Sequence, residues 1–393
     1  MLVCGAMQFQ RPPEEHAASA RKAPLWAQAL GSADAFREEQ AQIGKVWTLL
    51  GFASDVSKDG DWFRSMLGGR SVFVQRFKDE LRGFENVCAH RFFPLRTKDK
   101  GNGPIRCGFH HWQYNKDGLA VGIPNCVELF GVIPRELGAK LKPLEIAVCG
   151  KLIFGRFPSA EHRESLEEYL GPGFDILKAM WSGDSAPYIA HSEIKANWKL
   201  GHHISLDDYH IVAVHPDSFG KHGYHPVEKT RYFRFGRHSA YFWGASEGVV
   251  NDTAAQCRAG TYRPTDYRIL QFFPNLVAVH FEAAGTWYVL LQQYVPVAHD
   301  RTLLRSIYQE APFPPQDANF FYKVMRKIAA PFLPWIVPIY LRKIIREDNE
   351  VCENLQTSIA QIDGPMILGK QEERIVWFEE NYAEVVGKIG RND

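Results

Sequence analysis

Two pairs of metal-binding side chains stand sixteen residues apart in the sequence, Cys88-Ala89-His90 and Cys107-Gly108-Phe109-His110. Thiolate and imidazole groups suit two centres: tetrahedral zinc, or a two-iron, two-sulfur cluster with both cysteines on one iron and both histidines on the other. A zinc finger with two cysteines and two histidines normally groups its cysteines in one pair and its histidines in the other. Here each pair supplies one of each from a β-rich setting, so the spacing favours the cluster.

A second group of ionisable side chains lies in the middle of the chain. On a single helix, His203, Asp207 and His210 share one face. His215 can join them if the helix ends before Pro216, because the residue before a proline is pushed out of the α region. Two histidines and a carboxylate are typical ligands of an iron that keeps positions open for oxygen. Polar core histidines bonded to their neighbours are the alternative.

Asp348 is the candidate for the missing carboxylate. It stands on an apolar helical stripe that includes Ile345, while Glu347 turns away from that stripe. A carboxylate on a buried face is costly unless it is paired or binds a metal, so a buried salt bridge or a hydrogen-bonded cap is the alternative. We expect Asp348 to complete an iron site with His210 and His215.

The elements that must position these groups fall into three parts. Residues 1–45 are polar and become helical toward their end, and we expect this segment to pack on the last domain. Residues 46–158 hold short β-rich runs separated by glycine-containing turns, which is typical of an all-β module. Residues 159–393 mix strands and helices and predict an α+β domain. Its strand candidates are residues 230–236, 240–244, 267–272, 276–282 and 287–296.

Composition and charge exclude several classes of protein. The 393 residues carry 46 basic and 45 acidic side chains, a net charge of +1, so no global field favours nucleic acid or anionic lipid. Seven scattered cysteines argue for a reducing compartment, with the cytoplasm as the default. Residues 328–341 are apolar but too short, and too interrupted by prolines, to span a bilayer. We expect a buried or surface-packed turn region there, and neither a membrane nor nucleic acid as a partner.

The first pattern, Cys-x-His and, sixteen residues later, Cys-x-x-His, resembles the Rieske motif. With its length and its second group of ionisable side chains, the whole chain resembles the α (oxygenase) subunit of the Rieske non-heme iron oxygenases. The family pattern Asp-x-x-His-x4-His matches Asp207, His210 and His215, and its late acidic ligand matches Asp348. The resemblance implies an all-β Rieske [2Fe-2S] domain and, after it, an α+β catalytic domain with an antiparallel sheet of the helix-grip or START-like kind.

The sequence departs from the family pattern beside both sets of ligands. Phe92 and His111 stand where the family usually has glycine, and Phe109 replaces a frequent tyrosine. His203 occupies a position that often holds asparagine, and its role as a weak ligand, a substrate contact or a hydrogen-bond donor stays open. Because hydrogen bonds near the cluster sulfurs tune its potential, these departures bear on the potential more than on ligation.

The resemblance also implies an assembly and a reaction. In head-to-tail homotrimers the cluster of one chain faces the iron of its neighbour, and Asp207 would link His210 to His110 of the partner subunit. The alternative is that Asp207 is a partner of His210 within its own chain only. Electrons from NAD(P)H would arrive through a ferredoxin and/or a flavin reductase, since the chain has no glycine-rich nucleotide fingerprint of its own. O2 and Fe(II) would then hydroxylate or dihydroxylate an aromatic substrate.

Two other functions stay open. The same iron chemistry supports oxidative N- or O-demethylation of a small substrate. A non-catalytic electron carrier would need only the cluster, and the long second domain argues against it. For the substrate pocket of an oxygenase, we expect these side chains: His203, Ile204, Leu206, Phe272, Phe281 and Trp287.

Overall fold

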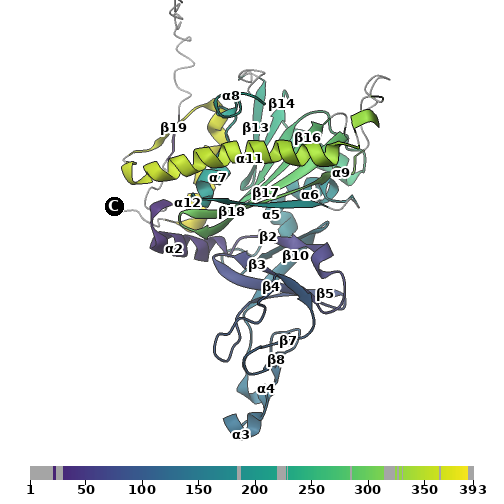
Figure 1. Cartoon of the computed structure of the whole chain (residues 1–393), viewed down its shortest axis with the longest axis vertical. Helices are drawn as coiled ribbons and strands as arrows, with labels where there is room; N and C mark the ends of the chain where they lie inside the picture. Colours follow the sequence, from purple (N-terminus) through teal and green to yellow (C-terminus); the bar gives the residue numbers. More distant parts are fainter. Residues whose placement is uncertain are drawn as a thin grey trace, which may run out of the picture.

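The computed structural model describes residues 21–23, 30–183, 187–218, 227, 229–283, 286–313, 324, 327–329, 331–362 and 364–387. Two large antiparallel sheets lie one above the other along the long axis of the molecule (Figure 1). The lower sheet belongs to the β-rich module, and the upper sheet to the part of the chain that mixes strands and helices. This arrangement confirms the expected fold class, an all-β domain followed by an α+β domain.

In the lower domain, the described residues form a seven-stranded sheet in the order β2-β11-β10-β5-β4-β3-β6 and a three-stranded sheet in the order β7-β8-β9. The strands are β2 (Thr48–Phe52), β3 (Asp61–Leu67), β4 (Arg70–Phe77), β5 (Glu80–Glu85), β6 (Lys100–Asn102), β7 (Ile105–Arg106), β8 (Gln113–Tyr114), β9 (Ala120–Gly122), β10 (Pro143–Cys149) and β11 (Leu152–Arg156). The module also contains three short helices, η2 (Ala53–Val56), α3 (Cys126–Phe130) and α4 (Pro134–Leu137).

In the upper domain, the described strands form a seven-stranded antiparallel sheet in the order β12-β18-β17-β16-β15-β14-β13. They are β12 (Tyr188–Ile194), β13 (Thr230–Phe235), β14 (His238–Trp243), β15 (Arg268–Phe272), β16 (Leu276–Ala283), β17 (Thr286–Ala298) and β18 (Arg301–Glu310). Around them lie α5 (Leu166–Leu170), α6 (Gly173–Met180), α7 (Trp198–Ile204), α8 (Ile211–Val214), α9 (Val249–Arg258), α11 (Leu333–Ser358), η4 (Ile359–Gln361), η5 (Lys370–Glu372) and α12 (Glu373–Val386). The long helix α11 crosses in front of this sheet (Figure 1).

The amino-terminal helix α2 (Ala33–Ile43) is joined to the upper domain through a buried carboxylate. Glu39 is fully buried and accepts hydrogen bonds from Trp198 Nε1 at 2.6 Å and from the Tyr382 hydroxyl at 2.5 Å. The ammonium group of Lys199 pairs with the same carboxylate. A short strand, β1 (Arg21–Ala23), pairs with β19 (Met366–Leu368). These contacts tie the start of the chain to α7, β19 and α12.

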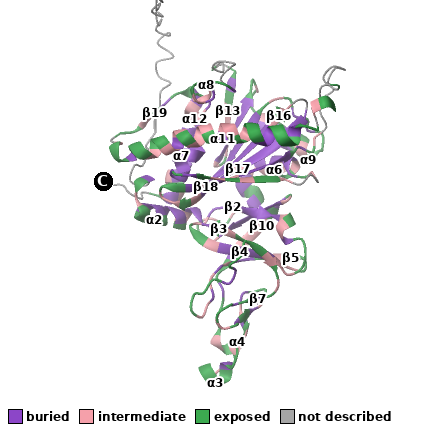
Figure 2. Ribbon diagram, in the orientation of Figure 1, coloured by how far each residue is buried: buried purple, intermediate pink, exposed green. Residues whose placement is uncertain are grey.

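The first turns of α11 correct one sequence-based expectation. The apolar stretch that ends at Leu341 does not form a turn region, because it is helical from Leu333 onward. Pro334 lies in the first turn, where a helix tolerates proline, and Pro338 lies inside the helix. Much of this stretch is exposed (Figure 2). No helix in the described part of the chain is long and apolar enough to cross a membrane.

Candidate functional site

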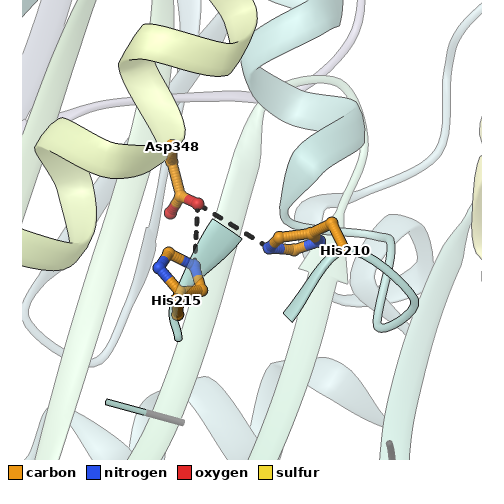
Figure 3. A group of neighbouring side chains, drawn as sticks. All are labelled: His210, His215 and Asp348. Atoms are coloured by element: carbon orange, nitrogen blue, oxygen red, sulfur yellow. Dashed lines mark ion pairs between the residues drawn. The ribbon is translucent and has the colours of Figure 1, made fainter. Parts of the chain in front are cut away.

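Three predicted ligands meet between α8 and α11 (Figure 3). Asp348 Oδ1 lies 3.0 Å from His215 Nε2 and 3.7 Å from His210 Nε2. One ligand atom from each of the three residues lies within 4.8 Å of the others. The two histidines flank the single-turn helix α8, which ends at Val214 with His215 as its C-cap, directly before Pro216. The proline therefore ends the helix where the sequence predicted a break.

The path from His203 to His210 differs from the single helix expected from the sequence. Helix α7 ends at Ile204, and Ser205 is its C-cap. The His203 ring points to another element, with Nε2 2.8 Å from Glu379 Oε1 on α12. Asp207 starts the next turn by accepting hydrogen bonds from the backbone N–H groups of Tyr209 and His210. His203 and His210 therefore do not share a helical face.

Each histidine of the triad also faces a second carboxylate. His215 Nδ1 lies 2.8 Å from Glu347 Oε2, and His210 Nδ1 lies 3.4 Å from Asp207 Oδ2. Carboxylates that orient the non-coordinating nitrogen are characteristic of histidine metal sites. Sequence reasoning assigned Glu347 to the outward side of α11 and missed this contact. The sequence did contain a signal for this contact: Glu347 directly precedes the proposed ligand Asp348, so both carboxylates can reach the same imidazole.

The donor set fits a metal ion. Asp348 Oδ1 is buried and faces the imidazoles of His215 and His210 without a well-aligned hydrogen bond. Burial lowers the pKa of His215, but the nearby carboxylates of Asp348 and Glu347 outweigh that effect and leave the pKa raised. A cation between the three side chains would take the place of the proton on His215 and bind this buried oxygen. The two-histidine, one-carboxylate set is the one used by non-heme Fe(II) oxygenases.

The cluster candidates lie on two loops with the same hydrogen-bond pattern. In the first loop, Cys88 N–H donates to the Phe93 carbonyl, and Phe92 N–H donates to the Cys88 carbonyl. In the second loop, Cys107 N–H donates to the Trp112 carbonyl, and His111 N–H donates to the Cys107 carbonyl. This repeat presents one thiol and one imidazole from each loop on the same side.

The side chains of the two loops converge at the lower end of the molecule. Cys88 and Cys107 are both buried, and the rings of His90 and His110 lie 4.7 Å apart between centroids. His90 stacks on Trp112 at 4.6 Å, and its Nδ1 has no hydrogen-bond partner in the described part of the chain. Two thiols beside two imidazoles fit a [2Fe-2S] cluster with mixed ligands. The Tyr114 hydroxyl lies 3.0 Å from Cys88 Sγ, a contact that the sequence did not predict.

The triad opens into a cavity of about 740 Å³. This volume lies within the range of small-molecule pockets. Of the predicted pocket residues, Ile204, Phe281 and Trp287 line it. Val277, Val279 and Phe281 alternate along β16, so their side chains reach the same face. The other lining side chains that reasoning missed include Asp208, Tyr241, Trp243, Tyr267, Ile336 and Tyr340.

The remaining predicted pocket residues lie elsewhere. Phe272 is three residues beyond Ile269, a lining residue of β15, so it faces the opposite side of the sheet and packs against Phe235. Leu206 is fully buried away from the cavity, and His203 faces Glu379. These three side chains belong to the packing around the cavity.

Comparison with known proteins decides the family. Residues 180–388, slightly more than half of the chain, match the sequence model of the ring hydroxylating alpha subunit (catalytic domain). Residues 46–135 match the Rieske [2Fe-2S] domain. The chain belongs to the Rieske oxygenase α subunits. Subunits of this family use a [2Fe-2S] cluster, a mononuclear iron and O2, with electrons supplied by a reductase.

Several curated Rieske oxygenase α subunits are similar in sequence. The large oxygenase component of salicylate 5-hydroxylase from Ralstonia sp. is 26% identical, over 53% of this chain and 52% of that protein. The terminal oxygenase α subunit 2 of terephthalate 1,2-dioxygenase from Comamonas sp. is 26% identical, over 69% and 70%. The oxygenase subunit of glycine betaine monooxygenase from Chromohalobacter salexigens is 29% identical, over 44% and 38%. The chain thus spans about half of the first of these relatives, and less of several others.

Solved structures of Rieske oxygenases share the fold over almost the whole chain. The quaternary ammonium Rieske monooxygenase CntA, in complex with L-carnitine, has a TM-score of 0.68 at 19% identity, covering 96% of this chain and 99% of that chain. Naphthalene 1,2-dioxygenase from Rhodococcus sp., bound to indole, has a TM-score of 0.68 at 20% identity, covering 93% and 94%. The α+β domain after the Rieske domain is therefore the family's catalytic fold.

Proposed function

We propose that this chain is the terminal oxygenase component of a multicomponent Rieske oxygenase that hydroxylates or dihydroxylates an aromatic substrate. The observation that carries the proposal is the convergence of His210, His215 and Asp348 on one wall of a largely apolar cavity. Aromatic side chains such as Tyr267 and Trp287 suit an aromatic ring.

The residues near the two proposed metal centres would have distinct roles. His210, His215 and Asp348 would hold the mononuclear iron, which supplies the binding and activation of O2. Glu347 and Asp207 orient the two imidazoles through the nitrogens that face away from Asp348. The apolar wall excludes water and presents the substrate to the open side of the triad. Cys88, Cys107, His90 and His110 would hold the cluster.

We further propose that the active form is a head-to-tail homotrimer served by a ferredoxin and/or flavin reductase in the cytoplasm. The cluster loops lie in the lower part of the folded subunit and the triad in its upper part (Figure 1). A neighbouring chain is therefore the better source of electrons for the iron. Asp207 is partly exposed beside His210 and would reach His110 of the partner subunit.

Oxidative N- or O-demethylation is the second candidate. No lysine or arginine occurs among the described residues that line the cavity, whereas Asp208, Asp266 and Glu282 do. Acidic and aromatic side chains together suit a substrate with a cationic nitrogen. Release of formaldehyde during turnover would identify demethylation, and a hydroxylated ring without formaldehyde would identify the first candidate.

The Asp348→Ala variant tests the proposed function. We expect it to lose mononuclear iron and turnover, while the cluster keeps its spectrum after dithionite reduction. Glu350→Ala is the matched control, since it lies on the exposed side of the same helix. Iron and acid-labile sulfide content give the readout. A variant that retained all its iron would exclude Asp348 as a ligand.

A further inference from the structure

The first turns of α11 are apolar on two sides. Leu333, Val337 and Ile345 face inward, where they line the cavity. The other side exposes large apolar side chains at the spacing of one helical face: Phe332 (59% exposed), Trp335 (76%), Ile336 (56%) and Ile339 (63%). A helix that is apolar all round is normally buried. We therefore expect this exposed face to contact another molecule.

The exposed face adjoins the mouth of the cavity. Ile336 and Tyr340 belong both to the cavity lining and to the exposed apolar side chains. Ile328, ahead of the helix, is exposed as well. From Tyr340 the same helix reaches Asp348 after eight residues, about 12 Å along its axis. The apolar surface thus continues from the outside of the molecule to the proposed iron site.

The charged side chains that the sequence places on and just before this stretch of helix are basic, although Lys343 pairs with Asp217 and Glu347. Between residues 323 and 346 the sequence contains six basic side chains and no acidic one. Lys327, Arg342 and Arg346 are exposed. A short apolar helix that carries tryptophan and is flanked by basic side chains is typical of peptides that lie in the interface of an anionic bilayer.

We propose that the exposed face of α11, from Phe332 to Ile339, docks on an anionic lipid surface and that the cavity draws apolar substrate from that surface. Such a helix lies in the headgroup region without spanning the bilayer, so the contact agrees with the absence of a membrane-spanning helix in the described chain. The near-zero net charge of the whole chain does not oppose the contact, because lipid attraction acts within a Debye length of the local basic cluster.

Vesicle co-sedimentation of the full chain tests the proposal. We expect the protein to sediment with vesicles of phosphatidylcholine mixed with phosphatidylglycerol, and to do so less with phosphatidylcholine alone. Trp335→Asp should weaken binding by about tenfold or more, because it removes a large apolar side chain from the interface. The double variant Arg342→Gln and Arg346→Gln should weaken binding to the anionic vesicles by roughly tenfold.

Leu355→Asp is the matched control, because Leu355 is an exposed apolar residue of the same helix about 30 Å from Trp335. It should bind vesicles like the unmodified protein. Circular dichroism and metal content check that each variant folds. The proposal is overturned if the unmodified protein ignores both vesicles, or if Trp335→Asp and Leu355→Asp bind alike. It is also overturned if Trp335→Asp leaves vesicle binding unchanged but lowers the mass in solution, since the face is then a contact between copies.

Discussion

Glu347 Oε2 lies 2.8 Å from His215 Nδ1, on the side of the ring opposite Asp348. Two consecutive residues of α11 therefore hold the same imidazole from both of its nitrogens. We expect Glu347→Gln to weaken iron binding by about 10–100-fold, because the amide no longer fixes the ring or raises its basicity. Iron titration of the apoprotein measures the effect. The exposed Glu350→Gln should bind iron normally, and equal affinity in the two variants would refute the role of Glu347.

Phe92 and His111 have φ values of 61° and 59°, in the left-handed region. That conformation costs a residue with a Cβ about 1–2 kcal/mol, and substitution by glycine removes this cost. Part of the resulting gain in stability is lost because glycine has greater conformational freedom in the unfolded chain. We expect Phe92→Gly and His111→Gly each to raise the stability of the loops by up to about 1 kcal/mol. Thermal unfolding should show a higher midpoint for both, and a lower one for the neighbouring control Phe93→Gly.

Glu39 pairs with Trp198, Tyr382 and Lys199 in the core that joins α2 to the upper domain. Its replacement by glutamine leaves the buried ammonium group of Lys199 without a counter-charge, which typically costs about 3–5 kcal/mol. We expect Glu39→Gln to unfold at markedly lower urea concentration. The exposed Glu38→Gln, one position earlier on the same helix, should behave like the unmodified protein.

His238 is buried in its neutral form. Phe273 N–H donates to Nδ1 at 3.1 Å, and Nε2 donates to the Tyr169 carbonyl at 2.7 Å. Burial lowers the pKa of His238 from 6.5 to about 4. Between those values the unfolded chain binds more protons, so the free energy of unfolding falls as the pH drops from 6.5 toward 4.

His238 should contribute about 3 kcal/mol to this loss. The free energy of unfolding, measured by denaturation across that pH range, should therefore change less with pH in His238→Gln, although this variant is less stable at neutral pH. The exposed His191→Gln should keep the slope of the unmodified protein. A slope that does not change in His238→Gln would show that other groups cause the acid sensitivity.

The sequence was most informative where a pattern is local. The two cysteine–histidine pairs, the two histidines of the triad and the carboxylate at Asp348 could be selected because each needs only its own loop or helix. The strands from β13 to β17 could also be predicted from their apolar runs. The β12 strand, an edge strand with several exposed residues, lacks such a run and was missed.

Contacts between distant segments could not be predicted. Glu347 and His215 are 132 positions apart, and their contact depends on how α11 crosses the sheet. His203 was placed on one helix with His210 because nothing in the sequence showed that α7 ends at Ile204. Phe272 was assigned to the cavity because the face that a strand turns toward a pocket depends on the whole sheet.

Because the cluster loops and the triad lie far apart within one chain, each chain of the proposed trimer would give electrons to one neighbour and receive them from the other (Figure 1). A chain with Cys107→Ala lacks the cluster that would serve its neighbour, and a chain with Asp348→Ala lacks the iron site that its neighbour's cluster would serve. Neither should turn over alone. Once unfolded together and reassembled, or produced together in one cell, the two should restore part of the activity, because some neighbours then pair an intact cluster with an intact triad. The two inactive variants should therefore complement each other within a mixed trimer.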